Sequence, residues 1–264
     1  MIKEILPQIT AECPWRDTLH WYDTIDSTNT RAKELAKDGA PHGTVIVAGS
    51  QTGGRGRMGR SFSSPEGMGV YLSVILRPNC TADRLMHLTC AAGVAAISAV
   101  EKVCGICPDI KWANDLILGG KKLGGILTEL GFSGSRVDYA IIGIGINCRQ
   151  RAWDFPPEIQ DIATSLLEQT GTDIDPAHLA AALTESLYQL DQQLIAGKAQ
   201  LMDTYRQHCT TLGKEIFVLH GDEQMGATAL DLDADGGLIV RFTDGTEKTV
   251  NFGEVSIRGI CRYM

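Results

Sequence analysis

Residues 139–147 read YAIIGIGIN, a run in which nearly every side chain is apolar or is absent altogether. A strand with one solvated face alternates apolar and polar residues, whereas a strand covered on both faces is apolar throughout. This run therefore predicts a buried strand with other elements packed against both of its faces.

Strand and helix patterns alternate along the chain before and after this run. Stretches rich in β-branched and aromatic residues predict strands at 44–48, 70–76, 110–112 and 125–130. N-capping residues, and apolar positions that recur every three or four residues, predict helices at 27–37, 83–103, 177–195 and 201–209. Together these elements predict an α/β catalytic domain over residues 1–212, in which helices cover the sheet.

The pattern changes after Gly213. Short strand patterns follow at 215–220, 227–233, 238–243 and 248–251. Gly236-Gly237 and Asp244-Gly245 between them supply the residues of tight hairpin turns. Residues 213–264 therefore predict a small β-barrel appended to the α/β domain.

The charge balance limits the kind of partner. The chain has 264 residues, with 24 Lys and Arg against 32 Asp and Glu, and a formal net charge of -8. Such a field repels nucleic acid and anionic membranes, so any bound anion needs a local basic cluster. The first residues lack the apolar stretch of a signal peptide, and no uninterrupted apolar run reaches the ~20 residues that span a bilayer. We therefore expect a cytoplasmic protein without a nucleic-acid or membrane partner.

The eight cysteines are expected to be free thiols, because the cytosol keeps them reduced. Cys104 and Cys107 form one C-x-x-C pair, but no second pair and no His at ligand spacing accompanies it. A redox motif should open a helix, whereas this pair ends a helical pattern just before Pro108. The pair is therefore interpreted as packing thiols.

The basic cluster is concentrated in residues 53–60, which read GGRGRMGR and follow a predicted strand. Glycine lets the backbone approach a ligand, and arginine supplies forked donors for carboxylate or phosphate. Gly54, Gly56 and Gly59 also match G-x-G-x-x-G, but neither the helix nor the later acidic residue of a dinucleotide site follows. An RNA-binding RG segment is disfavoured in an acidic protein. The loop therefore predicts a site for a small anion.

A second polar segment, 111–115, reads KWAND, and residues 121–127 read KKLGGIL. Lys111 and Lys122 add two cations, and Asp115 is a candidate ligand for Mg²⁺ that accompanies a nucleotide. The Gly-Lys-Ser/Thr ending of a P-loop is absent. Taken alone, KWAND could equally be a strand end followed by a hairpin turn.

Together these segments resemble the biotin–protein ligases, from Asp26 to Arg258. The motifs that carry the resemblance are 26–29 (DSTN), Gln51 with 54–60, 111–115, 122–127, 143–147 (GIGIN) and 253–258 (GEVSIR). The resemblance implies a mixed sheet flanked by helices, of the class II aminoacyl-tRNA synthetase and biotin ligase type, with a C-terminal SH3-like barrel. It implies a ligase that joins biotin to ATP as biotinyl-5'-AMP, releases pyrophosphate, and transfers biotin to a lysine of the biotin carboxyl carrier protein of a carboxylase.

The resemblance also implies roles for individual residues. It places biotin against Ser27, Thr28, Asn29, Gln51, Arg55, Gly56, Arg57, Lys122 and Gly125. It places ATP against Arg57, Arg60, Phe62, Asn114, Asp115, Asn147 and Arg258. It assigns catalysis to Arg55, Arg57, Lys111, Asp115 and Lys122, with Asp115 also as the ligand of Mg²⁺.

The residue types suit this chemistry. Biotin's carboxylate is ionised at neutral pH, so its attack on phosphorus needs cations rather than a base. The acceptor lysine must instead lose a proton, and Asp115 is our hypothetical proton acceptor or orienting group. The loop 53–64 carries many like charges and few apolar residues, which predicts mobility without ligand and closure over the adenylate.

Two departures from the family pattern affect the nucleotide pocket. Ala113 stands where the family commonly has proline, and Phe62 stands where tryptophan is common, which keeps an aromatic face but loses the indole donor. The 25 residues before Asp26 are too few for a helix-turn-helix domain, so we expect the monofunctional type without a DNA-binding head. The alternatives are a lipoate-type ligase, whose resemblance lacks GRGRMGR, and a non-catalytic biotin-binding protein. Family members often form homodimers through their sheets, and we take 139–147 as one candidate edge strand.

Overall fold

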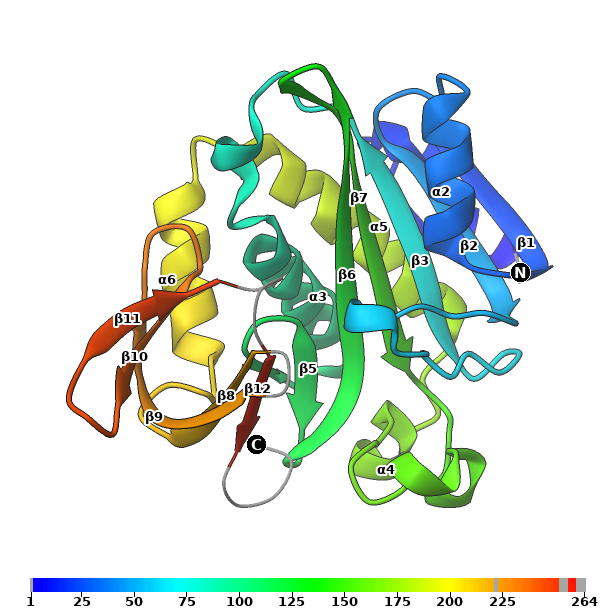
Figure 1. Cartoon of the computed structure of the whole chain (residues 1–264). Helices are drawn as coiled ribbons and strands as arrows, with labels where there is room; N and C mark the ends of the chain where they lie inside the picture. The colour runs from blue at the N-terminus through cyan, green and yellow to red at the C-terminus, as the bar shows by residue number, and fades with distance from the viewer. Residues whose placement is uncertain (1, 221–222, 252–255, 260–264) are drawn as a thin grey trace.

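The computed structural model describes residues 2–220, 223–251 and 256–259, which form two sheets and their covering helices (Figure 1). The larger sheet has seven strands in the order β1-β2-β3-β7-β6-β5-β4. Only β1 and β2 run parallel, so the sheet is mixed, as expected. Its strands are β1 (Leu19–Ile25), β2 (Thr44–Gln51), β3 (Gly69–Leu76), β4 (Asp109–Lys111), β5 (Asp115–Leu118), β6 (Lys121–Ser133) and β7 (Arg136–Asn147).

Strand β7 contains the YAIIGIGIN run and lies in the middle of this sheet, paired with β3 and β6. One set of its side chains, including Ile141, packs with the helix α2 (Thr28–Lys37). The alternate set, including Ile142, packs in the larger core with the helices α3 (Leu88–Cys104) and α5 (Pro176–Gln193). Coverage of both faces is confirmed, and the interpretation of 139–147 as an edge strand is wrong, because both edges of this strand are already hydrogen bonded.

The other helices and turns complete the α/β part. Helix α6 (Lys198–His208) packs against α3 and β4. The short helices are α1 (Ile2–Ile5), α4 (Leu166–Thr170) and the 3-10 turns η1 (Leu6–Gln8), η2 (Pro14–Thr18), η3 (Arg57–Gly59), η4 (Ala82–Leu85), η5 (Ala152–Asp154) and η6 (Pro157–Ile159). The helix predicted from residue 83 begins as an α-helix only at Leu88, after the separate turn η4.

One described segment, Ala82–Cys104, is long and apolar enough to cross a membrane by length and composition. In the fold, 67% of its most apolar window is buried inside the protein. Its hydropathy is therefore that of a core helix packed between the large sheet, α5 and α6.

The C-terminal strands form a separate antiparallel sheet in the order β11-β10-β9-β8-β12. They are β8 (Glu215–His220), β9 (Glu223–Leu232), β10 (Leu238–Phe242), β11 (Glu247–Val250) and β12 (Ser256–Gly259). Gly236 and Gly245 adopt positive φ values of 88° and 87° in the predicted hairpin turns. The domain boundary at 212/213 and closure into an SH3-like barrel stay predictions.

Seven cysteines fall among the described residues, and all seven are free thiols. Cys107 is exposed, so its interpretation as a packing thiol is wrong, whereas Cys104 is half-buried. Cys107 Sγ lies 3.8 Å from His208 Nδ1. No group of three His, Cys, Asp or Glu side chains suited to a metal occurs in the described part of the chain.

Candidate active site

A cavity of about 690 Å³ opens at the ends of β2 and β7, beneath the loop 53–64. It brings together every residue that the sequence predicted for the site except Arg258, whose side chain lies outside the described residues. Among the described residues, five cationic side chains line it, with one carboxylate, that of Asp115. The five are Arg55, Arg57, Arg60, Lys111 and Lys122. In a protein of net charge -8, this cavity is a local site for anions.

The polar end of the cavity is built at the N-terminus of α2, where Thr28 and Asn29 are almost fully buried. The amide of Asn29 donates both of its hydrogens to the protein, to Leu127 O at 3.2 Å and to Glu129 Oε2 at 2.9 Å. The Thr28 hydroxyl donates to Gln51 Oε1 at 3.2 Å. Thr28 Oγ1 and Asn29 Oδ1 can therefore only accept further hydrogen bonds, and such acceptors suit a ligand with N–H groups.

Gln51 is held in one orientation by neighbours on both sides. Its Oε1 accepts the backbone N–H of Thr28 at 2.8 Å, and its Nε2 donates to Ser64 Oγ at 2.8 Å. One amide hydrogen of Gln51 remains for a ligand acceptor. Ser73 lies below, fully buried, 2.8 Å from Thr28 Oγ1 and 2.7 Å from Asn29 Oδ1.

Two glycines of β7 leave room for this arrangement. A Cβ atom at Gly143 would lie 1.9 Å from Asn29 Oδ1, and one at Gly145 would lie 2.5 Å from the Phe62 ring. Phe62 also packs edge-to-face on Tyr71, with 6.4 Å between the ring centroids. The Phe62 ring therefore lines the cavity against the sheet, rather than pointing into solvent.

The loop 53–64 folds back on itself as an irregular hairpin. Its backbone bonds join Gln51 to Ser64, Gly54 to Phe62 and Gly56 to Arg60. Gly54 is required by close approach, because a Cβ there would lie 2.3 Å from Phe62 O. Met58 takes a positive φ of 54° at the tip and is 63% exposed. Mobility of this loop without ligand stays a prediction.

The guanidinium of Arg57 reaches from this hairpin into the cavity. Its Nη1 donates to Asn114 Oδ1 at 3.0 Å, while its buried Nη2 has no hydrogen-bond partner among the described residues. Burial lowers the pKa of Arg57, and the charge of Asp115 opposes that shift. A buried, unsatisfied cationic donor is costly, so this nitrogen is a candidate contact for an anionic ligand atom.

The KWAND turn is fixed from three directions. Asn114 Nδ2 donates to Ile126 O at 3.0 Å, and Tyr205 OH donates to Ala113 O at 3.0 Å. The buried indole of Trp112 donates to Gly236 O, in the β9–β10 turn, at 2.8 Å. The peptide bond between Trp112 and Ala113 is cis. Asp115 Oδ1 accepts from Lys122 Nζ at 2.6 Å, across the β5–β6 hairpin.

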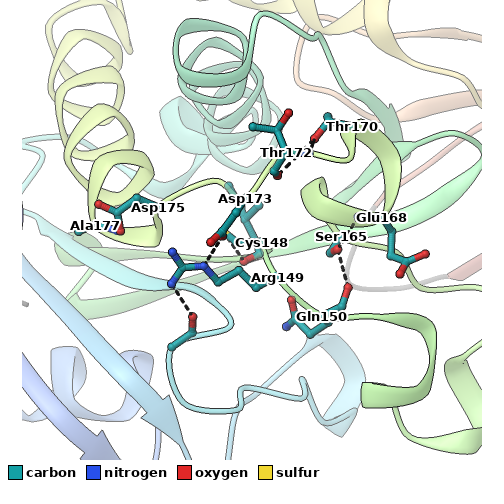
Figure 2. A network of polar contacts seen from close by, with 12 residues as sticks. Cys148, Arg149, Gln150, Ser165, Glu168, Thr170, Thr172, Asp173, Asp175 and Ala177 are labelled. Atoms are coloured by element: carbon teal, nitrogen blue, oxygen red, sulfur yellow. Dashed lines mark hydrogen bonds and ion pairs between the residues drawn. The ribbon is translucent and has the colours of Figure 1, made fainter.

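The far wall of the cavity comes from the segment after β7. Asn147, 5% exposed, donates to Thr164 O at 2.9 Å, and the buried Gln150 donates to Asn147 Oδ1 at 3.3 Å. Figure 2 shows how this segment is anchored: Arg149 bonds to Asp173 at 2.5 Å, and Ser165 donates to Gln150 O at 2.6 Å. The apolar side chains of this wall are Phe155, Ile159, Ile162 and Ala163.

Sequence reasoning missed the apolar wall, because residues 151–165 show no helix or strand periodicity. It also missed Ser73 and Glu129, which support the polar end from β3 and β6. A signal for both exists: each is a polar residue inside a predicted strand that is otherwise largely apolar, VYLSVIL and GILTEL.

Known proteins contain this arrangement. The family model of the biotin/lipoate A/B protein ligase family matches residues 21–147, and that of the biotin protein ligase C-terminal domain matches 211–258. The bifunctional ligase/repressor BirA of Bacillus subtilis is 38% identical over 87% of this chain and 71% of its own length. The biotin–[acetyl-CoA-carboxylase] ligase of Mycobacterium tuberculosis is 31% identical over 94% of this chain and 91% of its own.

A solved structure agrees with the sequence relatives. The biotin protein ligase of Aquifex aeolicus in complex with biotin and ATP superposes with a TM-score of 0.78 at 32% identity. The match covers 92% of this chain and 99% of that one. With relatives above 30% identity matched over more than two thirds of their length, the chain belongs to the biotin protein ligases.

Proposed function

We propose that this protein activates biotin with ATP and transfers it to a lysine of a carrier protein, as an AMP-forming biotin–[acetyl-CoA-carboxylase] ligase. The observation that carries the proposal is the cavity itself. Its polar end offers fixed acceptors at Thr28 and Asn29, and its described lining also holds five cations, among them Arg57 with its unsatisfied Nη2. Biotin has the matching features, a ureido ring with two N–H groups and a carboxylate at the end of an aliphatic chain.

In the first step, a carboxylate oxygen of biotin attacks the α-phosphorus of ATP, the bond to the β-phosphate oxygen breaks, and pyrophosphate leaves. Both reactants are anions, so the barrier falls when preorganised cations offset their repulsion. We assign Arg57 Nη2 and Lys122 Nζ as the donors to the biotin carboxylate and to the oxygens of the α-phosphate. Asp115 holds Lys122 at 2.6 Å and so fixes its direction.

Asp115 is also the one carboxylate in the described lining that can meet Mg²⁺. Magnesium commonly binds one or two carboxylates together with substrate phosphates and water. This donor set fits a Mg²⁺ that arrives with ATP, and the ion would supply further neutralisation of the phosphates.

In the second step, the ε-amine of the acceptor lysine attacks the carbonyl carbon of biotinyl-5'-AMP, an amide bond forms, and AMP leaves. The ammonium form cannot attack, so a proton must first leave the amine. Asp115 lies at the cavity and is our candidate to accept or orient that proton.

A lipoate-type ligase is the alternative with the same fold. The dithiolane ring of lipoate has no N–H group, so it leaves the acceptors at Thr28 and Asn29 unpaired. Sites built to hydrogen bond a ligand discriminate strongly against analogues that lack the bond. The polar end of this cavity therefore favours biotin over lipoate.

The test is biotin-dependent exchange of labelled pyrophosphate into ATP, followed by avidin blotting of a purified carrier domain. We expect exchange with biotin, none with lipoate, and a biotin label on the carrier. Exchange with lipoate alone would overturn the assignment, and biotin binding without exchange would favour the non-catalytic alternative.

Three further predictions concern partners and location. The chain's net charge of -8 supports our expectation that nucleic acid is not a partner. A homodimer would have to use an edge other than β7, and the terminal strands of the large sheet are β1 and β4. A cytoplasmic location stays a prediction, and the free thiols of the described cysteines agree with it.

A further inference from the structure

Glu129, on β6, lies just behind the polar end of the cavity and does not line it. Its carboxylate has two hydrogen-bond donors and one further ion-pair partner among the described residues. Asn29 Nδ2 binds Oε2 at 2.9 Å, Lys33 Nζ binds Oε1 at 2.5 Å, and Arg55 Nη2 forms an ion pair with Oε1 at 3.3 Å. Two of these partners, Asn29 and Arg55, line the cavity, one on α2 and the other on the hairpin loop.

A carboxylate can only accept hydrogen bonds, and this fixes the orientation of the neighbouring amide. Glu129 requires Asn29 to turn its NH₂ group toward β6, so its oxygen faces Ser73 and Gly143. The same carboxylate attracts Arg55 and so ties the hairpin to the sheet. One half-buried charge thus sets two groups that come from distant parts of the chain.

We propose that Glu129 is a positioning residue for biotin, which holds Asn29 as an acceptor for the ureido N–H and ties Arg55 of the hairpin to the ring end of the cavity. This rests on the proposed function. In this proposal Glu129 determines that the ring end of the cavity presents hydrogen-bond acceptors. The carboxylate of biotin and the phosphates of ATP meet other residues.

The negative charge, rather than the shape of the side chain, carries this role. Burial acts to raise the pKa of Glu129, but hydrogen bonds from Lys33 and Asn29 and the charges of Lys33 and Arg55 outweigh it. Its pKa therefore lies below the ordinary value and the group is anionic at neutral pH. Glutamine has nearly the same shape, but its NH₂ group would meet either Asn29 or the two cations as a second donor.

The experiment compares Glu129→Gln with Glu185→Gln in the full chain. Glu185 is a matched control: it is a buried carboxylate bound to Lys102 at 2.6 Å and to Thr10 N at 2.7 Å, away from the cavity. We expect Glu129→Gln to raise the KM for biotin about tenfold, as loss of a charge-assisted bond would. The KM for ATP should change by less than about twofold, because Asn29, Lys33 and Arg55, the partners of Glu129, are not residues assigned to ATP. Glu185→Gln should lower the melting temperature and leave both KM values unchanged.

A third variant separates positioning from simple ion pairing. Lys33 binds Glu129 but does not line the cavity, so Lys33→Met should leave the KM for biotin near that of the wild type. An unchanged biotin KM in Glu129→Gln would overturn the inference, as would parallel rises in the KM for biotin and ATP. Failure of the proposed function is a separate result, because then the wild-type chain itself would show no pyrophosphate exchange with biotin.

Discussion

Arg57 binds Asn114 through Nη1, and in our proposal its Nη2, which has no partner among the described residues, meets a ligand oxygen. A lysine in its place keeps the charge but cannot bind in two directions at fixed angles. We expect Arg57→Lys to reduce kcat/KM for pyrophosphate exchange by about 10- to 100-fold. Arg241→Lys, in an exposed ion pair with Glu247 on the C-terminal sheet, is the matched control and should be silent. Equal activity of both variants would refute the role of Arg57.

The carboxylate of Asp115 serves both steps in our proposal, and one substitution separates them. Asp115→Asn loses the charge that holds Lys122 and the group that can take a proton. We expect transfer from preformed biotinyl-5'-AMP to the carrier to slow by about tenfold or more. A variant that forms adenylate slowly but transfers it at the normal rate would restrict Asp115 to the first step.

Most residues of the site could be predicted from the sequence, because their motifs combine chemistry with turn-forming glycines. The orientation of these residues could not. That Asn29 presents an oxygen, and that Asn114 is bound by Arg57, depends on Glu129 and on pairing between strands far apart in the sequence. A motif in the sequence does not show which residues from other strands will lie beside it in the fold.

Among the elements, α5 is linked to the N-terminal segment through the carboxylate of Glu185, which accepts the backbone N–H of Thr10. Burial raises its pKa, but hydrogen bonds from Lys102 and Thr10 and the charge of Lys102 outweigh this, so its pKa in the folded protein is depressed. Such a group stabilises the fold above its unfolded pKa, and this stability is lost as pH falls through the folded pKa.

Urea unfolding as a function of pH tests this. At neutral pH, the urea concentration at the unfolding midpoint should be lower for Glu185→Gln than for the wild type. The difference should shrink as pH falls from about 6 to about 3, because the wild-type carboxylate then also becomes neutral. A difference that stays constant over this range would show that the charge of Glu185 is irrelevant to α5.

The strands with strong apolar patterns, such as β3 and β7, were predicted well from sequence. Strands β1 and β5 were missed. β1 reads LHWYDTI, with polar residues on both sides, because it is the edge of the sheet and is only partly buried. β5 has four residues and follows the KWAND turn directly, so it has too few positions to show a period.

At the scale of the molecule, the two sheets share contacts through β4, α6 and the β9–β10 turn. Trp112 bonds to Gly236, Arg206 on α6 bonds to Asp231 at 2.7 Å, and Lys198 pairs with Asp235. The bond of Trp112 is buried and joins a residue that lines the cavity to the C-terminal sheet, whereas the other two are ion pairs from α6.

We therefore expect both sheets to unfold together. Urea titrations followed by tryptophan fluorescence and by far-ultraviolet circular dichroism should give coincident transitions. Tyr205→Phe removes the buried bond to Ala113 O and should lower the free energy of unfolding by about 1–3 kcal/mol, again in one transition. Separate transitions for the two signals would show that the C-terminal sheet folds independently of the site.

The two glycines of β7 have a consequence for how such a site can diversify. The room around Asn29 and Phe62 exists only because no side-chain atom grows from Gly143 or Gly145, and the strand cannot move aside because it is paired on both edges. Substitutions at these two glycines are therefore rarely tolerated at this end of the cavity. The wall from Phe155 to Ala163 contains no glycine, so we expect new ligand preferences to arise there.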